Sequence, residues 1–301
     1  MKGREDAPGT MYRIAIDTGG TFTDAVVMDG AGSIVVTKAN TTPEDNTVGV
    51  LNSIEKAAAR LKMGLEDLLG KTVSIIHAST TASNTLVMHA GAKTGSICTK
   101  GFRDVVEMRR GWRGDPFDVR TPLPFQLSPR YLRATVDERI VYDGSVVTPL
   151  NEQDVERACE LFKKHGVESI AVCLLFSFLN PTHERKVAEI VRRVLPDTHV
   201  SLSSDVLPML DEFDRFSTTT VDAYLAPKVR SYMVSLQEKL RSLGFKGKFF
   251  VGACSGGVMR PEDAVKKPVY TLESGPAAVP VAGTFYGKVK GWPNVIAIDM
   301  G

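Results

Sequence analysis

Cysteine, long apolar runs and net charge are all scarce in this sequence. Its 301 residues include four cysteines, which stand far apart and show none of the short spacings of a metal site. We therefore expect reduced thiols in a cytoplasmic protein. No apolar run approaches the roughly 20 residues of a membrane span. A formal net charge of +2 gives no reason to expect nucleic acid or a membrane surface as a partner.

The stretch from Ile14 to Asp24, IAIDTGGTFTD, carries the strongest functional signal. A short apolar run predicts a buried strand, and Asp17 stands at its end. Gly19 and Gly20 permit a turn with positive φ that comes close to a ligand. The remaining polar groups are those of Thr18, Thr21, Thr23 and Asp24. Exposed N–H groups and hydroxyls hold phosphate oxygens, and a nearby carboxylate holds the Mg²⁺ that accompanies them. The alternative is a plain hairpin with a Gly-Gly turn.

The last residues, VIAIDMG from Val295 to Gly301, repeat this pattern. An apolar run, expected to be a strand, again ends in an aspartate, Asp299, and a glycine follows shortly after it. Two such strand–Asp–turn units that face each other would form a phosphate clamp between two lobes. We expect the chain to stop inside the second of these loops, as a part of a longer protein.

Helical and strand patterns alternate along the chain. Thr42 followed by proline predicts the start of a helix that runs to about Leu61. A strand is expected over residues 73–76, so that His77 stands at its end and opens a hydroxyl-rich segment that includes Asn84. This segment fits a ligand site at a strand end, and it fits a serine- or threonine-capped helix start equally well.

The later part of the chain predicts a change of organisation near residue 204. Residues 151–203 alternate helix and strand, which is typical of a doubly wound lobe. Residues 271–278 predict a Gly/Pro turn. We therefore expect two domains, 1–203 with the first phosphate loop and 204–301, which ends inside the second. The family resemblance described next implies that 204–301 is the start of a second ATPase domain.

Six blocks spread over the chain resemble one family. They are IDTGGTFTD (16–24), HASTTASNTL (77–86), SSDVLPMLDEFDRFSTTTVDAYL (203–225), CSGGV (254–258), LESGPAA (272–278) and IAIDMG (296–301). In this order they resemble the A-type subunit of the ATP-dependent hydantoinase/oxoprolinase family, which includes a lactam hydrolase and acetone and acetophenone carboxylase subunits. The wider superfamily contains sugar kinases, actin and heat-shock chaperones. The resemblance therefore implies an α/β, actin-like ATPase fold of two lobes with mixed sheets flanked by helices, the second lobe truncated.

The sequence departs from the family pattern in three places. Ala78 and Ser79 stand where the family often has Gly-Thr, and Met88 and His89 stand where it often has an acid and an arginine. Ser255 takes the place of a frequent asparagine before Gly-Gly. The first loop is intact, so ATP use is expected, while the identity of the substrate is left open.

The resemblance implies an enzyme that spends ATP with Mg²⁺, or Mn²⁺ in its place, to phosphorylate a substrate carbonyl oxygen. Positioning and charge stabilisation dominate such a transfer. The implied phosphate contacts are Thr18, Gly19, Gly20, Thr21, Thr23, Asp24 and Gly301; the implied metal ligands are Asp17, Asp24 and Asp299; the implied catalytic residues are Asp17, His77 and Asn84. A lone histidine at a strand end is, however, more often structural.

Within this resemblance, hydrolysis of a cyclic amide such as a hydantoin, oxoproline or lactam is the main functional hypothesis. A ketone carboxylase subunit is the alternative, and a non-enzymatic actin- or chaperone-like ATPase is more remote. The family also implies a B-type subunit as partner. The basic and aromatic segment from Met108 to Phe125, with Trp112, offers anchors for docking, but it also fits a plain surface loop.

Overall fold

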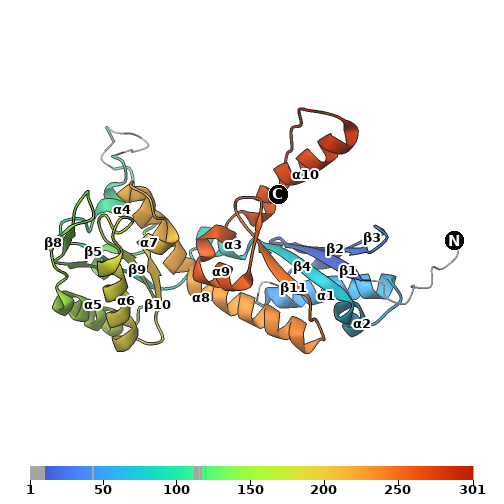
Figure 1. Ribbon diagram of the computed structural model, residues 1–301, viewed down its shortest axis with the longest axis horizontal. Coiled ribbons are helices and arrows are strands. Elements are labelled where there is room, and N and C mark those ends of the chain that lie inside the picture. The colour runs from blue at the N-terminus through green and yellow to red at the C-terminus, as the bar shows by residue number, and fades with distance from the viewer. Residues whose placement is uncertain (1–10, 43, 112–114, 116, 119, 301) are drawn as a thin grey trace. The chain divides into compact units, whose positions relative to one another are not determined.

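The structure is a computed structural model, and it describes residues 11–300 except 43, 112–114, 116 and 119 (Figure 1). Contacts divide the chain into unit 1, Met1–Met88 with Val229–Gly301, and unit 2, His89–Lys228. Each unit contains a sheet flanked by helices, which confirms the predicted α/β class. The domain boundary predicted near residue 204 stays a prediction, since contacts group the chain in a different way.

Unit 1 is built on a six-stranded mixed sheet with the order β12-β11-β4-β1-β2-β3. The strands are β1 (Tyr12–Thr18), β2 (Phe22–Asp29), β3 (Ile34–Asn40), β4 (Thr72–Ser79), β11 (Lys248–Gly252) and β12 (Val258–Met259). The first three form an antiparallel meander, whereas β4 pairs parallel to β1 and β11 pairs parallel to β4. The predicted hairpin at the start of the chain is therefore the first part of a larger mixed sheet.

Helices and one 3-10 turn complete unit 1. They are α1 (Asn46–Arg60), α2 (Leu65–Gly70), α3 (Thr81–Val87), α9 (Pro261–Lys266), η2 (Pro268–Thr271), α10 (Ser274–Lys290) and the second half of α8 (Glu212–Ser242), which begins in unit 2. Helix α1 packs on β2 and β3 with an apolar stripe that includes Val50, Ile54 and Ala57. The three- and four-residue spacing of this stripe places it on one helix face.

Three expectations about unit 1 need correction. Helix α1 is capped by Asp45, whose carboxylate accepts from the N–H of Thr47 at 3.0 Å, so Thr42 is not its N-cap. The turn expected over residues 271–278 is confined to Leu272 and Glu273, because α10 begins at Ser274, and a proline in the first helical turn costs no hydrogen bond. The run 295–300 forms no strand and leaves Ile296 and Ile298 exposed, since no described strand pairs with it.

Unit 2 contains a four-stranded parallel sheet with the order β10-β9-β5-β6. Its elements are β5 (Thr94–Thr99), α4 (Val105–Met108), η1 (Arg130–Leu132), β6 (Arg133–Val136), the small hairpin β7 (Arg139–Ile140) and β8 (Val146–Thr148), α5 (Glu152–His165), β9 (Ser169–Cys173), α6 (Thr182–Val194), β10 (His199–Leu202), α7 (Ser203–Val206) and the first half of α8.

Both faces of the unit 2 sheet are covered. Ile170 and Val172 of β9 face one core, which helices α5 and α6 complete, while the alternate residues Ala171 and Cys173 face another, which includes Phe216 of α8. Successive side chains of a strand point to opposite faces, so β9 is apolar throughout. This arrangement confirms the doubly wound lobe predicted for residues 151–203. In the described part of the chain, no helix has the length and apolarity needed to cross a membrane.

Candidate active site at the first loop

The β1–β2 hairpin places two carboxylates side by side. The register pairs Asp17 with Asp24 and Thr18 with Thr23, so each pair shares one face of the sheet. Residues of β1 alternate between buried and exposed, and Asp17 lies on the exposed face. The turn between the strands, residues 18–23, is called the first loop below. It closes where the N–H of Gly19 donates to the carbonyl of Phe22 at 2.9 Å.

Hydrogen bonds from two other segments hold the first loop. Thr41 donates its hydroxyl to the carbonyl of Gly19 and its N–H to the carbonyl of Thr21, both at 2.9 Å. The N–H of Thr80 donates to the carbonyl of Thr18 at 2.9 Å, and its hydroxyl donates to the same oxygen at 3.1 Å. The loop is therefore fixed at three carbonyls before any ligand arrives.

The N–H groups at the tip of the loop remain free. Gly20 and Thr21 are exposed, and neither backbone N–H donates to any group among the described residues. Thr18 and Thr23, in contrast, are 1% and 0% exposed, and the hydroxyl of Thr23 lies 3.1 Å from that of Thr41. The expectation that these two hydroxyls reach phosphate is therefore corrected: they are buried, because they stand on the inward face of the hairpin.

The carboxylates at the hairpin lie in a negative field. Although Asp17 lies on the exposed face of β1, the surrounding protein partly buries its carboxylate, and this burial raises its pKa above the usual value; the negative charges of Asp24 and Asp299 raise it further. Asp24 has one compensating contact, from the Lys38 ammonium at 3.1 Å. Gly275 at the start of α10 closes the other side, since a methyl group on it would lie 3.3 Å from Oδ1 of Asp17. The site thus combines uncompensated carboxylate charge with free N–H groups.

The described residues include no group of three or more His, Cys, Asp or Glu side chains arranged to hold a metal ion. A magnesium ion at phosphates is nevertheless commonly held by only one or two carboxylates, with water and phosphate completing its octahedron. Asp17 and Asp24 fit such a role, because burial and then the repulsion from Asp24 and Asp299 raise the pKa of Asp17, and a divalent cation would favour its ionised form.

His77 does not stand at a strand end, which corrects the expectation from sequence. Strand β4 continues to Ser79, and the His77 side chain is 0% exposed. One ring nitrogen lies 2.7 Å from the hydroxyl of Tyr232 on α8, while the other has no partner in the described structure. Burial lowers the pKa of His77 to about 4, so the ring is neutral at neutral pH. In this structure His77 is a core residue and does not face a ligand.

Asn84 lies closer to the loop. It stands on α3, is exposed, and donates its side-chain amide to the hydroxyl of Thr80 at 3.2 Å. A methyl group on Gly20 would lie 3.9 Å from the amide nitrogen of Asn84. Of the two polar residues expected on the substrate side, Asn84 is therefore the one that borders the loop tip. Gly301 lies outside the described residues.

Sequence reasoning missed several residues of this site. Thr41 and Thr80 supply the bonds that fix the loop, and Ser274 and Gly275 belong to a helix start that was read as a turn. The signal for the helix start was present, because Pro276 follows in a position that favours the first turn of a helix. No comparable pattern marks Thr41.

Two family regions match the chain. The hydantoinase/oxoprolinase N-terminal region matches residues 13–195, and the hydantoinase/oxoprolinase region matches residues 215–301. The chain belongs to the hydantoinase/oxoprolinase family. The family assignment made from the six sequence blocks is thereby confirmed.

Relatives within the hydantoinase/oxoprolinase family cover nearly the whole chain. Caprolactamase subunit alpha of Pseudomonas jessenii is 34% identical over 292 residues, which are 96% of this chain and 42% of the relative. The acetophenone carboxylase gamma subunit of Aromatoleum aromaticum is 34% identical over 303 residues, 96% of this chain and 41% of the relative. The crystal structure of the ATP-dependent caprolactamase matches with a TM-score of 0.89, covering 96% of this chain and 42% of that one. The chain thus spans about two fifths of the length of these relatives.

Proposed function

We propose that the complete protein is an ATP-dependent enzyme that activates the carbonyl of a cyclic amide, such as a hydantoin, oxoproline or lactam, for hydrolysis. This chain would supply the first half of the phosphate site. The membership in the hydantoinase/oxoprolinase family and the similarity to an ATP-dependent caprolactamase support the reaction class. The free N–H groups of Gly20 and Thr21 beside the carboxylates of Asp17 and Asp24 are the observation that carries the proposal.

The roles of the loop residues follow from this geometry. Gly20 and Thr21 donate their N–H groups to phosphate oxygens, while Thr41 and Thr80 keep the loop from moving as charge develops there. When bound, ATP with Mg²⁺, or Mn²⁺, would supply the phosphoryl group that makes the carbonyl oxygen a leaving group. Preorganised donors of this kind act without reorganisation during the transfer.

The carboxylates and two neighbouring polar residues have the remaining roles. Asp17 and Asp24 hold the cation, directly or through water, and Asp299 adds negative charge from the far end of the chain. Asn84 orients the substrate from the edge of the loop. His77 acts as a positioning residue, because its contact with Tyr232 ties β4, the neighbour of β1, to α8.

A second function has specific support. The acetophenone carboxylase gamma subunit is as similar to this chain as the caprolactamase subunit is, and both are named as subunits of larger enzymes. ATP-dependent ketone carboxylation is therefore the alternative. In either case we propose that the protein is cytoplasmic and acts with a B-type subunit on a small carbonyl substrate. The segment Met108–Phe125 remains a candidate docking surface; its Phe117 is 93% exposed, while Trp112 lies outside the described residues.

The test is a screen of the complete protein, co-expressed with its partner subunit, for substrate-dependent phosphate release from ATP. Hydantoins, lactams and 5-oxoproline test hydrolysis, and ketones with bicarbonate test carboxylation. We expect stimulation by one of the cyclic amides and its loss in Asp17→Asn, since removal of a metal-ordering carboxylate typically costs several kcal/mol of transition-state stabilisation. Stimulation by ketones alone would select the alternative. Near-normal turnover in the variant would remove Asp17 from the site.

A further inference from the structure

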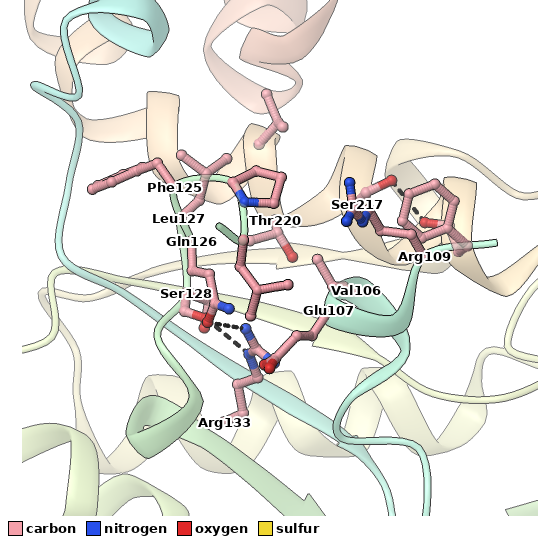
Figure 2. A pocket seen from close by; sticks show the side chains of 14 residues that line it. Val106, Glu107, Arg109, Phe125, Gln126, Leu127, Ser128, Arg133, Ser217 and Thr220 are labelled. Atoms are coloured by element: carbon pink, nitrogen blue, oxygen red, sulfur yellow. Dashed lines mark hydrogen bonds and ion pairs between the residues drawn. The ribbon is translucent and has the colours of Figure 1, made fainter. Parts of the chain in front are cut away.

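Unit 2 contains a pocket of about 190 Å³ that the first loop does not use (Figure 2). All residues that line it belong to unit 2. Its apolar lining comes from α4, from the segment before η1 and from α8, and consists of Val106, Leu123, Pro124, Phe125, Leu127, Phe213 and Val221. A mostly apolar concavity with a few polar groups is the usual form of a small-molecule site.

The Arg133 side chain, which lines the pocket, already has hydrogen-bond and ion-pair partners within the protein. Arg133 is 3% exposed in its side chain and donates to the carboxylate of Glu107 at 2.9 Å, to the side-chain oxygen of Gln126 at 2.6 Å and to the carbonyl of Ser128 at 2.8 Å. The bonds to Gln126 and Ser128 are among those drawn in Figure 2. The charges of Arg133 and Glu107 offset each other, so this pair adds polarity without a net charge.

Arg109 is different, because its charge has no counterpart. Its Nε is buried and has no hydrogen-bond partner, and its guanidinium makes no ion pair with any described residue. Arg109 and Ser217 both line the pocket (Figure 2). The backbone of Arg109 has φ 56° and ψ −135°, which a residue with a side chain rarely adopts. A partly buried cation without an anion is costly, and an anionic ligand would offset that cost.

The hydroxyls on α8 supply acceptors. Ser217 donates its hydroxyl hydrogen to the carbonyl of Phe213 at 2.7 Å, and Thr220 donates to the carbonyl of Phe216 at 2.8 Å. Because these hydrogens are used within the helix, the oxygens of Ser217 and Thr220 keep only acceptor capacity for a ligand. They cannot donate to a carboxylate, so the lining offers a carboxylate its favourable contact at Arg109, and a ligand with one carboxylate suits the pocket better than one with two.

We propose that this pocket binds a small organic monocarboxylate, whose carboxylate pairs with Arg109 and whose apolar body lies against Phe125, Leu127 and Val221. A carboxylate accepts two parallel hydrogen bonds from a guanidinium, which is the strongest contact the lining offers. The binding needs neither nucleotide nor the first loop, so it stands or fails separately from the proposed ATP-dependent reaction.

The test measures binding of benzoate and butyrate, with benzamide as the neutral counterpart of benzoate, by calorimetry and ligand-observed NMR on the full chain. We expect benzoate to bind with a dissociation constant of about 1 mM or tighter. Benzamide should bind about tenfold more weakly or worse, because it lacks the charge-assisted contact. Equal affinity for benzoate and benzamide, or no benzoate binding, would overturn the proposal.

Variants identify the site. Arg109→Gln should weaken benzoate binding about tenfold or more without lowering the melting temperature, since the guanidinium has no partner to lose. Arg157→Gln removes the same charge from an exposed position on α5 and should bind benzoate as the unaltered chain does. Ser217→Leu fills the pocket and should abolish the binding of benzoate and of butyrate. This variant keeps the proposal testable if the Arg109 variant folds poorly. Benzoate binding that survives in both pocket variants would place the ligand elsewhere.

Discussion

Replacement of Asp17 by asparagine should stabilise the isolated chain while it removes the function of the complete protein. In the folded state, burial and then the charges of Asp24 and Asp299 raise the pKa of Asp17, so its ionised form is disfavoured there. Opposed like charges on neighbouring strands cost about 0.2–1 kcal/mol. We expect Asp17→Asn to gain stability of that order, or about 0.3–2 °C in melting temperature for a chain of this size.

The stability difference between Asp17→Asn and the unaltered chain should depend on pH, in a direction that the raised pKa of Asp17 determines. Because the folded-state pKa of Asp17 lies above its model value of 3.8, folding takes up a proton in the window between the two values. The contribution of Asp17 to stability is therefore fully present below 3.8 and is lost as pH rises through the folded-state pKa. The advantage of Asp17→Asn should accordingly be complete at neutral pH and vanish below 3.8.

Thermal unfolding of both proteins across this pH range is the assay. Glu55→Gln on α1 is the control, since it removes the same charge from an exposed side chain that has no ion-pair partner among the described residues. It should shift the melting temperature little at any pH. An Asp17→Asn variant that is less stable than the unaltered chain at neutral pH would show that the Asp17 carboxylate makes a favourable contact, which would contradict the reasoning from repulsion.

Three further substitutions test the packing around the sites by chemical denaturation and, for the last, by turnover. Tyr232→Phe should cost about 1–3 kcal/mol, because it leaves the buried histidine of β4 with both ring nitrogens unpartnered. Gly95→Ala should cost about 1–3 kcal/mol, since its methyl group would lie 2.7 Å from the buried ring of Phe162. Gly275→Ala should displace the Asp17 carboxylate and lower ATP turnover of the complete protein without lowering stability, and unchanged turnover would contradict that placement.

The sequence predicted most elements because their patterns are local. The alternation of helix and strand over residues 151–203 appears as expected, and its first helix, α5, has an asparagine N-cap, Asn151, and a glycine of positive φ, Gly166, at its end. These signals depend on neighbouring residues, so tertiary contacts do not override them. The first loop was likewise located from Gly-Gly and its flanking carboxylates.

What the sequence could not show is which face each side chain takes. In the first loop, the threonine hydroxyls looked equivalent, yet Thr18 and Thr23 face inward from the paired strands β1 and β2, whereas Thr21 lies in the turn between them and is exposed. His77 looked like a terminal residue because β4 was predicted to end at residue 76. The strand continues for three more residues, and the His77 side chain lies on its buried face. An error of three residues in the predicted end of a strand therefore changes the expected role of a side chain.

The structure shows what surrounds Ala78 and Ser79, the two residues that depart from the family pattern. A methyl group on Gly252 of β11 would lie 3.4 Å from the Cβ of Ala78 and 3.2 Å from that of Ser274, so β4, β11 and the start of α10 meet here with no space to spare. The Ser79 hydroxyl lies 2.6 Å from that of Thr81, and the hydroxyl of Ser274 lies 3.5 Å from the Ser79 carbonyl. The altered pair thus belongs to the packing that carries α10 to Asp17. The bonds that hold the first loop come from other residues, so these departures leave the loop unchanged.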